Sequence, residues 1–153
     1  MAAPLIETST DIEATPEKVW SIVSDLARMG EWSPQCRKVI VRGGRTRLGA
    51  KTINVNKRGL LVWPTTATVT RFEPDRQITY RIAENRTEWG FEITPTDRGV
   101  TLTERRVAKN GKTTAASAFL IGKFMGGTEP FDDELAEGMR ETLQKIKAAA
   151  ERG

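Results

Sequence analysis

The longest regular apolar pattern in the chain lies near its C-terminal end. Between Thr128 and Glu151, apolar residues recur every three or four positions, the spacing that places side chains on one face of an α-helix. The members of this stripe are Phe131, Leu135, Met139, Leu143, Ile146 and Ala150. Acidic residues follow Pro130 and lysines lie near the end, as the helix dipole favours. The pattern predicts a long amphipathic helix that packs against the rest of the chain.

The period changes once near the start of the chain. Residues 5–13 alternate between apolar or small side chains and more polar ones, which predicts a half-buried strand. Thr15 and Pro16 then have the residue types of a helix N-cap and a first helical position. Asp25 is expected to cap a second short helix that Gly30 ends. We therefore expect two short helices after the first strand, with Trp20 in the core and Trp32 at the corner between helices and sheet.

From residue 35 to residue 109 the pattern is typical of strands joined by tight turns. Glycine, proline, asparagine and aspartate occur between short β-rich runs. The predicted strands span residues 36–41, 52–56, 60–72, 77–83, 88–94 and 100–108. Connections this short join antiparallel neighbours. Together with the first strand they predict an α+β protein with a seven-stranded antiparallel sheet.

Residues 115–125, AASAFLIGKFM, form an apolar segment with a single charge. Eleven residues are too few to cross a bilayer. The segment is compatible with a packed helix, a movable lid or a surface for a partner. As a lid it would place Phe119 and Phe124 at the mouth of a pocket.

Length and composition indicate one globular domain over residues 1–153. The chain is 38 % hydrophobic and 29 % charged, proportions typical of a protein with an ordinary buried core. It contains no apolar run long enough to span a membrane and no basic start followed by an apolar block. We therefore expect no stable membrane insertion and a cytoplasmic location, as a monomer or a homodimer.

The lack of histidine limits the chemistry that this chain can perform. It removes Ser-His and Cys-His nucleophiles, histidine metal sites and the commonest general base. Cys36 is the only cysteine, so no disulfide, metal site or cofactor is indicated. The net charge of +4 is spread along the chain, and the basic groups at residues 42–47 and 105–112 are expected to be solvated. Because no aromatic residues alternate with them, we expect no nucleic-acid partner.

Three segments resemble one protein family. Ala14 to Pro34, ATPEKVWSIVSDLARMGEWSP, resembles the opening of the polyketide cyclase/dehydrase branch of the START-like (SRPBCC) superfamily. The segments WGFEITPTDRGVTLTE and GMRETLQKIKAAAE are similar to its late strands and final helix. The resemblance implies a helix-grip fold, in which the sheet wraps around the C-terminal helix. It also implies a cavity between them for a hydrophobic or amphipathic small molecule.

Strand parity predicts which side chains would line such a cavity, because alternate residues share one face. The strand candidates are Trp63, Tyr80, Trp89, Phe91 and Glu104. The remaining candidates are Phe119 and Phe124 from residues 115–125, and Phe131, Leu135 and Met139 from the final helix. Gly138, beside Met139, indicates close approach of a ligand or a strand, or a packing contact.

Glu104 is the unusual member of this set. It shares a face with Val100 and Leu102, so its carboxyl group is expected to point inward, which is unfavourable unless the group is paired or protonated. It could bond to Tyr80, Trp63 or Trp89, or a frayed strand end could leave it in water. Alternatively, Glu104 anchors a ligand or acts as a general acid.

The resemblance, taken together with this pattern, implies two alternative functions. The first is a carrier or sensor that binds a lipid, a polyketide or an isoprenoid-like molecule without transforming it. The second is a polyketide cyclase or aromatase in which Glu104 and Tyr80, the two candidate catalytic residues, transfer protons. The lack of histidine and the few inward polar groups favour the first.

Overall fold

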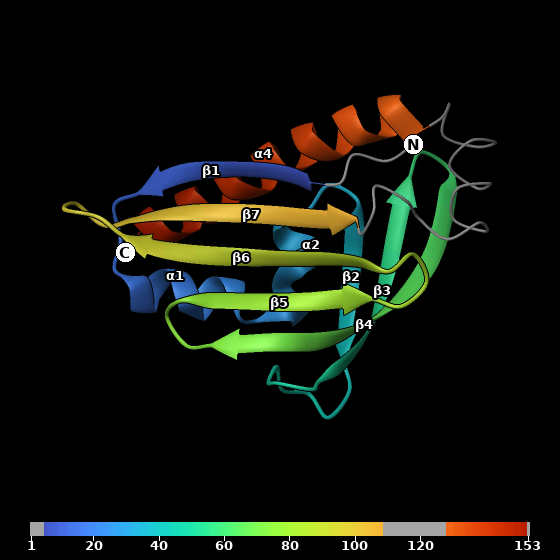
Figure 1. The fold of residues 1–153 in the computed structure, drawn as a ribbon, viewed down its shortest axis with the longest axis horizontal. Coiled ribbons are helices and arrows are strands. Elements are labelled where there is room, and N and C mark those ends of the chain that lie inside the picture. The colour runs from blue at the N-terminus through green and yellow to red at the C-terminus, as the bar shows by residue number, and fades with distance from the viewer. Residues whose placement is uncertain (1–4, 109–127, 153) are drawn as a thin grey trace.

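The computed structural model describes residues 5–108 and 128–152, with side chains of the last helix described from Asp133 onward. Its seven strands form one antiparallel sheet in the order β1-β7-β6-β5-β4-β3-β2 (Figure 1). The strands are β1 (Leu5–Ile12), β2 (Cys36–Val41), β3 (Lys51–Arg58), β4 (Leu61–Glu73), β5 (Gln77–Ile82), β6 (Thr87–Pro95) and β7 (Val100–Ala108). The predicted seven-stranded antiparallel sheet is confirmed.

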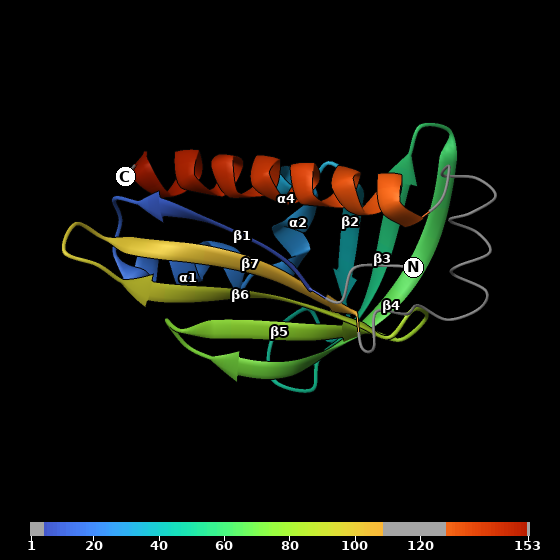
Figure 2. The same cartoon turned by 45° about the horizontal axis from the view of Figure 1, so that its top comes forward.

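One long helix and three short helical segments pack on the sheet. They are α1 (Pro16–Val23), the 3₁₀ turn η1 (Leu26–Arg28), α2 (Met29–Trp32) and α4 (Thr128–Glu151). Figure 2 shows α4 running nearly the length of the molecule above β1. Helices α1 and α2 contact α4 and also reach the sheet, α1 at β6 and α2 at β2. The sheet therefore wraps around the C-terminal helix, as expected. No helix in the described part of the chain has the length and apolar character needed to cross a bilayer.

The sheet bends sharply along β4. Figure 1 shows β2, β3 and the first half of β4 standing upright against the remaining strands. We call β2, β3 and residues 61–68 of β4 the upright wing. Beyond it, β4 pairs with β5 through a register shift between Val69 and Arg71, which leaves Thr70 as an extra residue. A bulge of this kind bends and twists the strand that contains it.

The apolar stripe of α4 is divided between two clusters. The C-terminal half, Leu143, Ile146 and Ala150, belongs to the main core with α1 and the sheet. Leu135 and Met139 instead form a smaller cluster, against which Trp63 and Trp89 pack. The C-terminal half of the stripe thus seals α4 to the main core, and the predicted packing of this amphipathic helix against the rest of the chain is confirmed.

The short helices agree with the sequence in one part and differ in another. Thr15 caps α1 as predicted, because its hydroxyl accepts the backbone N–H of Lys18 at 3.1 Å. Asp25 makes no side-chain cap, and Gly30 lies inside α2 instead of ending a helix. A side chain at Gly30 would overlap the carbonyl oxygen of Arg37. Gly30 is therefore needed for close packing of α2 on β2, not as a helix stop.

The two N-terminal tryptophans have the structural roles expected of them. Trp20 packs against the main core and meets Phe72 edge to face, with ring centroids 5.1 Å apart. Trp32 is buried in the same core, and the guanidinium of Arg28 lies 4.9 Å from the centre of its ring. Neither lines the pocket described next.

Candidate functional site

A pocket of about 150 Å³ lies between the sheet and the first half of α4. Its lining comes from the upright wing, β5, β6, β7, the segment around α2 and α4. Six of the residues predicted from the sequence line it: Trp63, Tyr80, Trp89, Glu104, Leu135 and Met139. The structure therefore brings together candidates from four strands and one helix.

The other predicted residues do not join this group. Phe91 is 2 % exposed and belongs to the main core. It shares the inward face with Trp89 but does not line the pocket. Phe119 and Phe124 lie outside the described residues, as does the whole 115–125 segment. The side chain of Phe131 is also outside them.

Strand register explains why the central pocket residues meet. Tyr80 on β5 lies opposite Trp89 on β6, and Trp89 lies opposite Arg106 on β7. Residues that face each other across antiparallel strands point to the same side of the sheet. These three side chains thus form one row on the inward face, and Glu104 belongs to the next row.

Glu104 is buried in this pocket without full hydrogen bonding. Its side chain is 4 % exposed, and Oε1 has no hydrogen-bond partner among the residues described. The indole N–H of Trp89, one expected partner, instead donates to the Thr87 hydroxyl at 3.1 Å. Burial raises the pKa of Glu104 to about 8. The side chain is therefore a neutral carboxylic acid at pH 7, able to donate one hydrogen bond and accept others.

The two neighbouring titratable groups are also uncharged near neutral pH. Burial raises the pKa of the Tyr80 hydroxyl well above its usual range, and the charges of Glu104 and Cys36, when present, raise it further. Burial likewise raises the pKa of the Cys36 thiol to about 11. Glu104, Tyr80 and Cys36 thus supply polar contacts without charge.

A ladder of neutral polar side chains forms the wall of the upright wing. The Thr52 hydroxyl donates to the Asn54 amide oxygen at 2.9 Å. The amide nitrogens of Asn54 and Asn56 donate to the Thr65 hydroxyl oxygen at 3.2 and 3.0 Å. Because Thr65 accepts two hydrogen bonds here, its own O–H remains available as a donor. Of these four, Thr52, Asn54 and Asn56 were not predicted to face the pocket.

The sequence contains a signal for this ladder. Thr52, Asn54 and Asn56 alternate with apolar Ile53 and Val55, so the two faces of β3 are clearly distinguished. The usual rule directs the apolar face toward the core. In this strand the polar face points inward, because it borders a pocket, and Ile53 is 41 % exposed.

Two further pocket residues were also missed. Arg106, expected to be solvated, is 2 % exposed, because it continues the inward alternation of Leu102 and Glu104. It has an interaction partner of its own. Gln35, which precedes β2, has a buried amide nitrogen without a hydrogen-bond partner in the described structure. Glu104 on β7 and Gln35 just before the edge strand β2 therefore line one pocket, and each has a polar atom, Glu104 Oε1 and Gln35 Nε2, without a hydrogen-bond partner in the described structure.

The first half of α4 closes the pocket on its helical side. Arg58 Nε donates to Glu134 Oε2 at 2.6 Å, which links the end of β3 to the helix. Gly138 lines the pocket, and a Cβ atom there would lie 3.2 Å from Cγ of Pro34. Gly138 thus makes a packing contact beside the pocket. In the described parts of the chain, no three Asp, Glu or Cys side chains are close enough to hold a metal ion.

Comparison with known proteins was made at the level of sequence and of fold. A family model for polyketide cyclase / dehydrase and lipid transport matches residues 4–151. No curated protein sequence matches the chain significantly. Among solved structures, the Polyketide_cyc-like protein Cgl2372 from Corynebacterium glutamicum is 27 % identical, with a TM-score of 0.61 over 96 % of this chain and 91 % of that one.

Two further solved structures share the fold at lower identity. KanY has a TM-score of 0.72 at 18 % identity, with 99 % of both chains covered. StfQ, a di-domain ARO/CYC from the steffimycin biosynthetic pathway, has a TM-score of 0.75 at 16 % identity over 97 % of this chain. The chain spans about half of StfQ, 51 % of its length.

Proposed function

The chain belongs to the polyketide cyclase / dehydrase and lipid transport family of the START-like (SRPBCC) superfamily, and from this premise we propose that it binds a hydrophobic or amphipathic small molecule as a carrier or sensor. The observation that supports this is a pair of buried polar atoms in the lining of one pocket, Glu104 Oε1 and Gln35 Nε2, for which residues 5–108 and 128–152 supply no hydrogen-bond partner. A buried polar atom without a partner destabilises a fold by about 1–3 kcal/mol. Hydrogen bonds from a ligand would remove that penalty.

The size of the pocket narrows the class of ligand. A cavity of about 150 Å³ is comparable to one that holds benzene. The pocket would therefore enclose a one-ring molecule, or one end of a larger one. A long lipid or an extended polyketide would be held by part of its length.

The chemistry of the wall narrows it further. Glu104, Tyr80 and Cys36 are neutral near pH 7, and the ladder on the upright wing consists of hydroxyl and amide groups. Leu135, Met139 and the two tryptophans provide the apolar surface. Such a wall suits carbonyl or hydroxyl oxygens on an apolar skeleton.

Acetophenone and isopropylbenzene test this proposal, because they have the same size and differ in a carbonyl oxygen. Calorimetric titration is expected to give roughly ten-fold tighter binding of acetophenone, the value of one hydrogen bond. Met139→Trp is expected to abolish binding by filling the pocket. Lys145→Trp, on the exposed side of the same helix, is expected to leave binding unchanged.

Equal affinity for the two molecules, or full binding by Met139→Trp, would contradict a polar ligand site in this pocket. Circular dichroism of both variants distinguishes lost binding from lost folding. Native mass spectrometry of freshly purified protein would then identify any molecule that remains bound during purification.

One observation favours a second candidate, a cyclase or aromatase. Glu104 has a pKa of about 8, close to the value at which a group both donates and accepts protons near neutral pH. Tyr80 is near enough for the charge of Glu104 to affect its pKa. A pocket that orients a poly-β-keto chain beside these groups could promote proton transfer and ring closure.

The double variant Glu104→Gln, Tyr80→Phe separates the two candidates. In a carrier, it is expected to retain acetophenone affinity within about ten-fold, because most of the apolar contacts remain. In an enzyme, it would abolish the cyclised products formed from a poly-β-keto thioester, as measured by chromatography, while acetophenone still binds. Product formation by the unchanged protein that is lost in this variant would decide for the enzyme.

A further inference from the structure

The basic residues of the chain are concentrated in one region. Residues 32–72 contain nine lysines and arginines and no aspartate or glutamate. The rest of the chain contains all twenty acidic residues and only fifteen of the 24 basic ones. The charge is therefore not spread evenly, as the sequence first indicated, but divided between a basic region and an acidic remainder. The basic region contains the whole upright wing.

Few of these basic side chains are neutralised. Arg58 pairs with Glu134, and Arg71 pairs with Glu73. None of the other ion pairs in the described structure involves a basic residue of this region. Lys38, Lys51 and Lys57 are exposed on the upright wing. The wing thus presents a positive surface.

The exposed apolar residues occur in the same region. Six large hydrophobic side chains are exposed among the residues described, and five of them lie between residues 32 and 72. These five are Ile40, Leu48, Ile53, Leu60 and Val62, with Leu60 at 101 % exposure in the turn between β3 and β4. The sixth, Leu5, lies on β1 at the opposite edge of the sheet.

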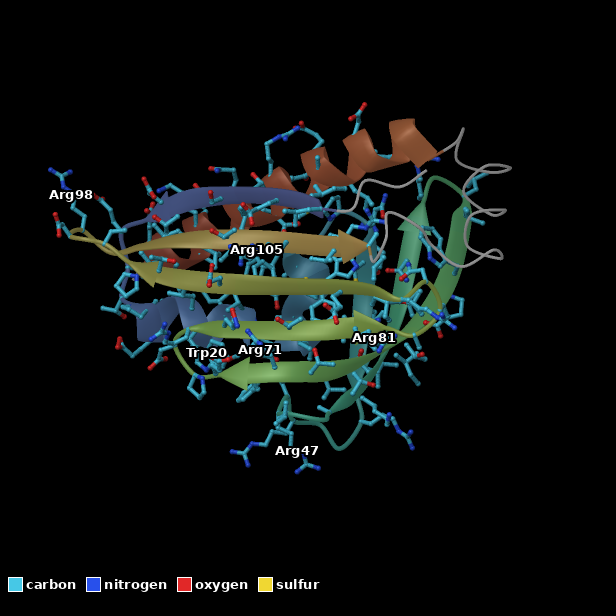
Figure 3. The ribbon with its side chains drawn as sticks, in the orientation of Figure 1. Trp20, Arg47, Arg71, Arg81, Arg98 and Arg105 are labelled. Carbon is cyan, nitrogen blue, oxygen red and sulfur yellow. The ribbon has the colours of Figure 1, made fainter. Side chains whose placement is uncertain are left out.

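Strand register places both kinds of residue on one face. Ile40 lies opposite Ile53, and Lys57 lies opposite Val62. Because the alternate residues of β3 point into the pocket, this row faces outward. Figure 3 shows Arg47, in the loop between β2 and β3, pointing away from the sheet. The outer face of the upright wing therefore combines apolar side chains with an excess of basic ones, and the carboxylate of Glu84, which accepts the Thr66 hydroxyl at 2.7 Å, is the acidic group that the described hydrogen bonds place on it.

We propose that the outer face of the upright wing docks on the surface of an anionic phospholipid bilayer. Reversible attachment to such a surface requires both buried apolar area and basic residues, and each Lys or Arg near the surface contributes measurably. A second copy of the chain would bring two positive faces together, which repel. Single-stranded nucleic acid would need exposed aromatic side chains, and Trp63 of this wing lines the pocket instead.

The position of this face has a consequence for the pocket. Asn54, Asn56 and Thr65 line the pocket from the inner side of the same strands. Docking would thus hold the ligand wall one sheet thickness from the lipid. The link between docking and the ligand pocket rests on the proposed function. Attachment to vesicles does not, because it requires no ligand.

Vesicle co-sedimentation tests the docking surface with two matched pairs of variants. The protein is expected to bind phosphatidylcholine vesicles that contain about one third phosphatidylglycerol, more weakly as salt rises, and to bind pure phosphatidylcholine poorly. Lys38→Glu with Lys57→Glu is expected to lower binding at least about ten-fold. The control, Lys18→Glu with Arg98→Glu, makes the same charge change away from the wing, and Figure 3 shows Arg98 at the far end of the molecule. It is expected to change vesicle binding by less than about three-fold.

The apolar part of the surface is tested by a second variant and its control. Leu60→Asp with Val62→Asp is expected to release the protein from anionic vesicles, whereas Leu5→Asp leaves it bound. No binding to anionic vesicles, or equal losses in the control variants, would overturn the proposal. A second outcome would also overturn it: Leu60→Asp with Val62→Asp leaves vesicle binding intact but dissociates a dimer that sedimentation velocity detects in the unchanged protein. The outer face would then be the contact between two copies of the chain. Acetophenone binding by the same variants reports separately on the pocket.

Discussion

Replacing Glu104 with glutamine is expected to stabilise the protein by about 3 kcal/mol at pH 7. In the folded protein, burial raises the pKa of this carboxyl group to about 8, from its ordinary value of 4.5. The unfolded chain ionises it freely at pH 7, whereas the folded chain must hold it protonated. Glutamine has nearly the same shape and does not ionise, so the difference disappears.

The sign of the pH dependence follows from the same shift. Between pH 4.5 and 8 the folded state binds one more proton at Glu104 than the unfolded state does, so this group lowers stability as pH rises through that range. The contribution of Glu104 to stability is most favourable below pH 4.5, the pKa in the unfolded chain, and least favourable above pH 8, the pKa in the folded protein. Urea denaturation at about pH 5, 7 and 9 is expected to show the decline in the natural protein and not in Glu104→Gln.

Glu88→Gln is the matched control for this prediction. Glu88 is half-buried on β6 and lines a groove on the outer side of the sheet, away from the pocket. Its change is expected to alter the free energy of unfolding by less than about 0.5 kcal/mol. A Glu104→Gln protein no more stable than the natural one at pH 7 would show that a partner compensates the buried carboxylate.

The second large effect is expected at the seal between α4 and the sheet. Ile146→Ala should lower the free energy of unfolding by about 3 kcal/mol, because Ile146 is fully buried in the main core and its truncation leaves a cavity. Lys145→Ala, on the exposed side of the same helix, should change stability by less than about 0.5 kcal/mol. Urea denaturation measures both differences.

Leu135→Ala gives the comparison within the apolar stripe. Leu135 lines the pocket, so its truncation enlarges an existing space and is expected to be less destabilising than Ile146→Ala. It should also change acetophenone affinity, which Ile146→Ala should not. Equal losses of stability would mean that the stripe is one continuous core and not a seal followed by a pocket wall.

Periodicity was sufficient to predict most of the fold. The stripe of α4 and the alternation of the strands depend on spacing alone, and both agree with the structure. The same alternation placed Glu104 inward beside Leu102, where it lies. These predictions succeed because a two-residue or 3.6-residue period is a property of the local backbone.

The polar half of the pocket could not be predicted in this way. Alternation separates the two faces of β3 but does not tell which one is inside. The rule that apolar residues face the core would turn Ile53 inward, whereas the structure buries Asn54 and exposes Ile53. The bend of the sheet at Thr70 arises from one extra residue in β4, which no composition signal marks. Arg106 is buried by the same alternation as Glu104, but its charge favoured an exposed position.

The bulge in β4 makes the capacity of the pocket a property of the backbone. Strand β4 belongs to both the upright wing and the rest of the sheet. The angle between these two parts of the sheet, which form two sides of the pocket, therefore depends on Thr70 and its neighbours. Exchanging lining residues such as Trp63 alters which ligand groups are recognised but leaves that angle in place. Insertion or removal of one residue at the bulge would instead widen or close the pocket with its lining unchanged. A protein with the same lining residues and a different number of residues at this bulge is therefore expected to accept ligands of a different size.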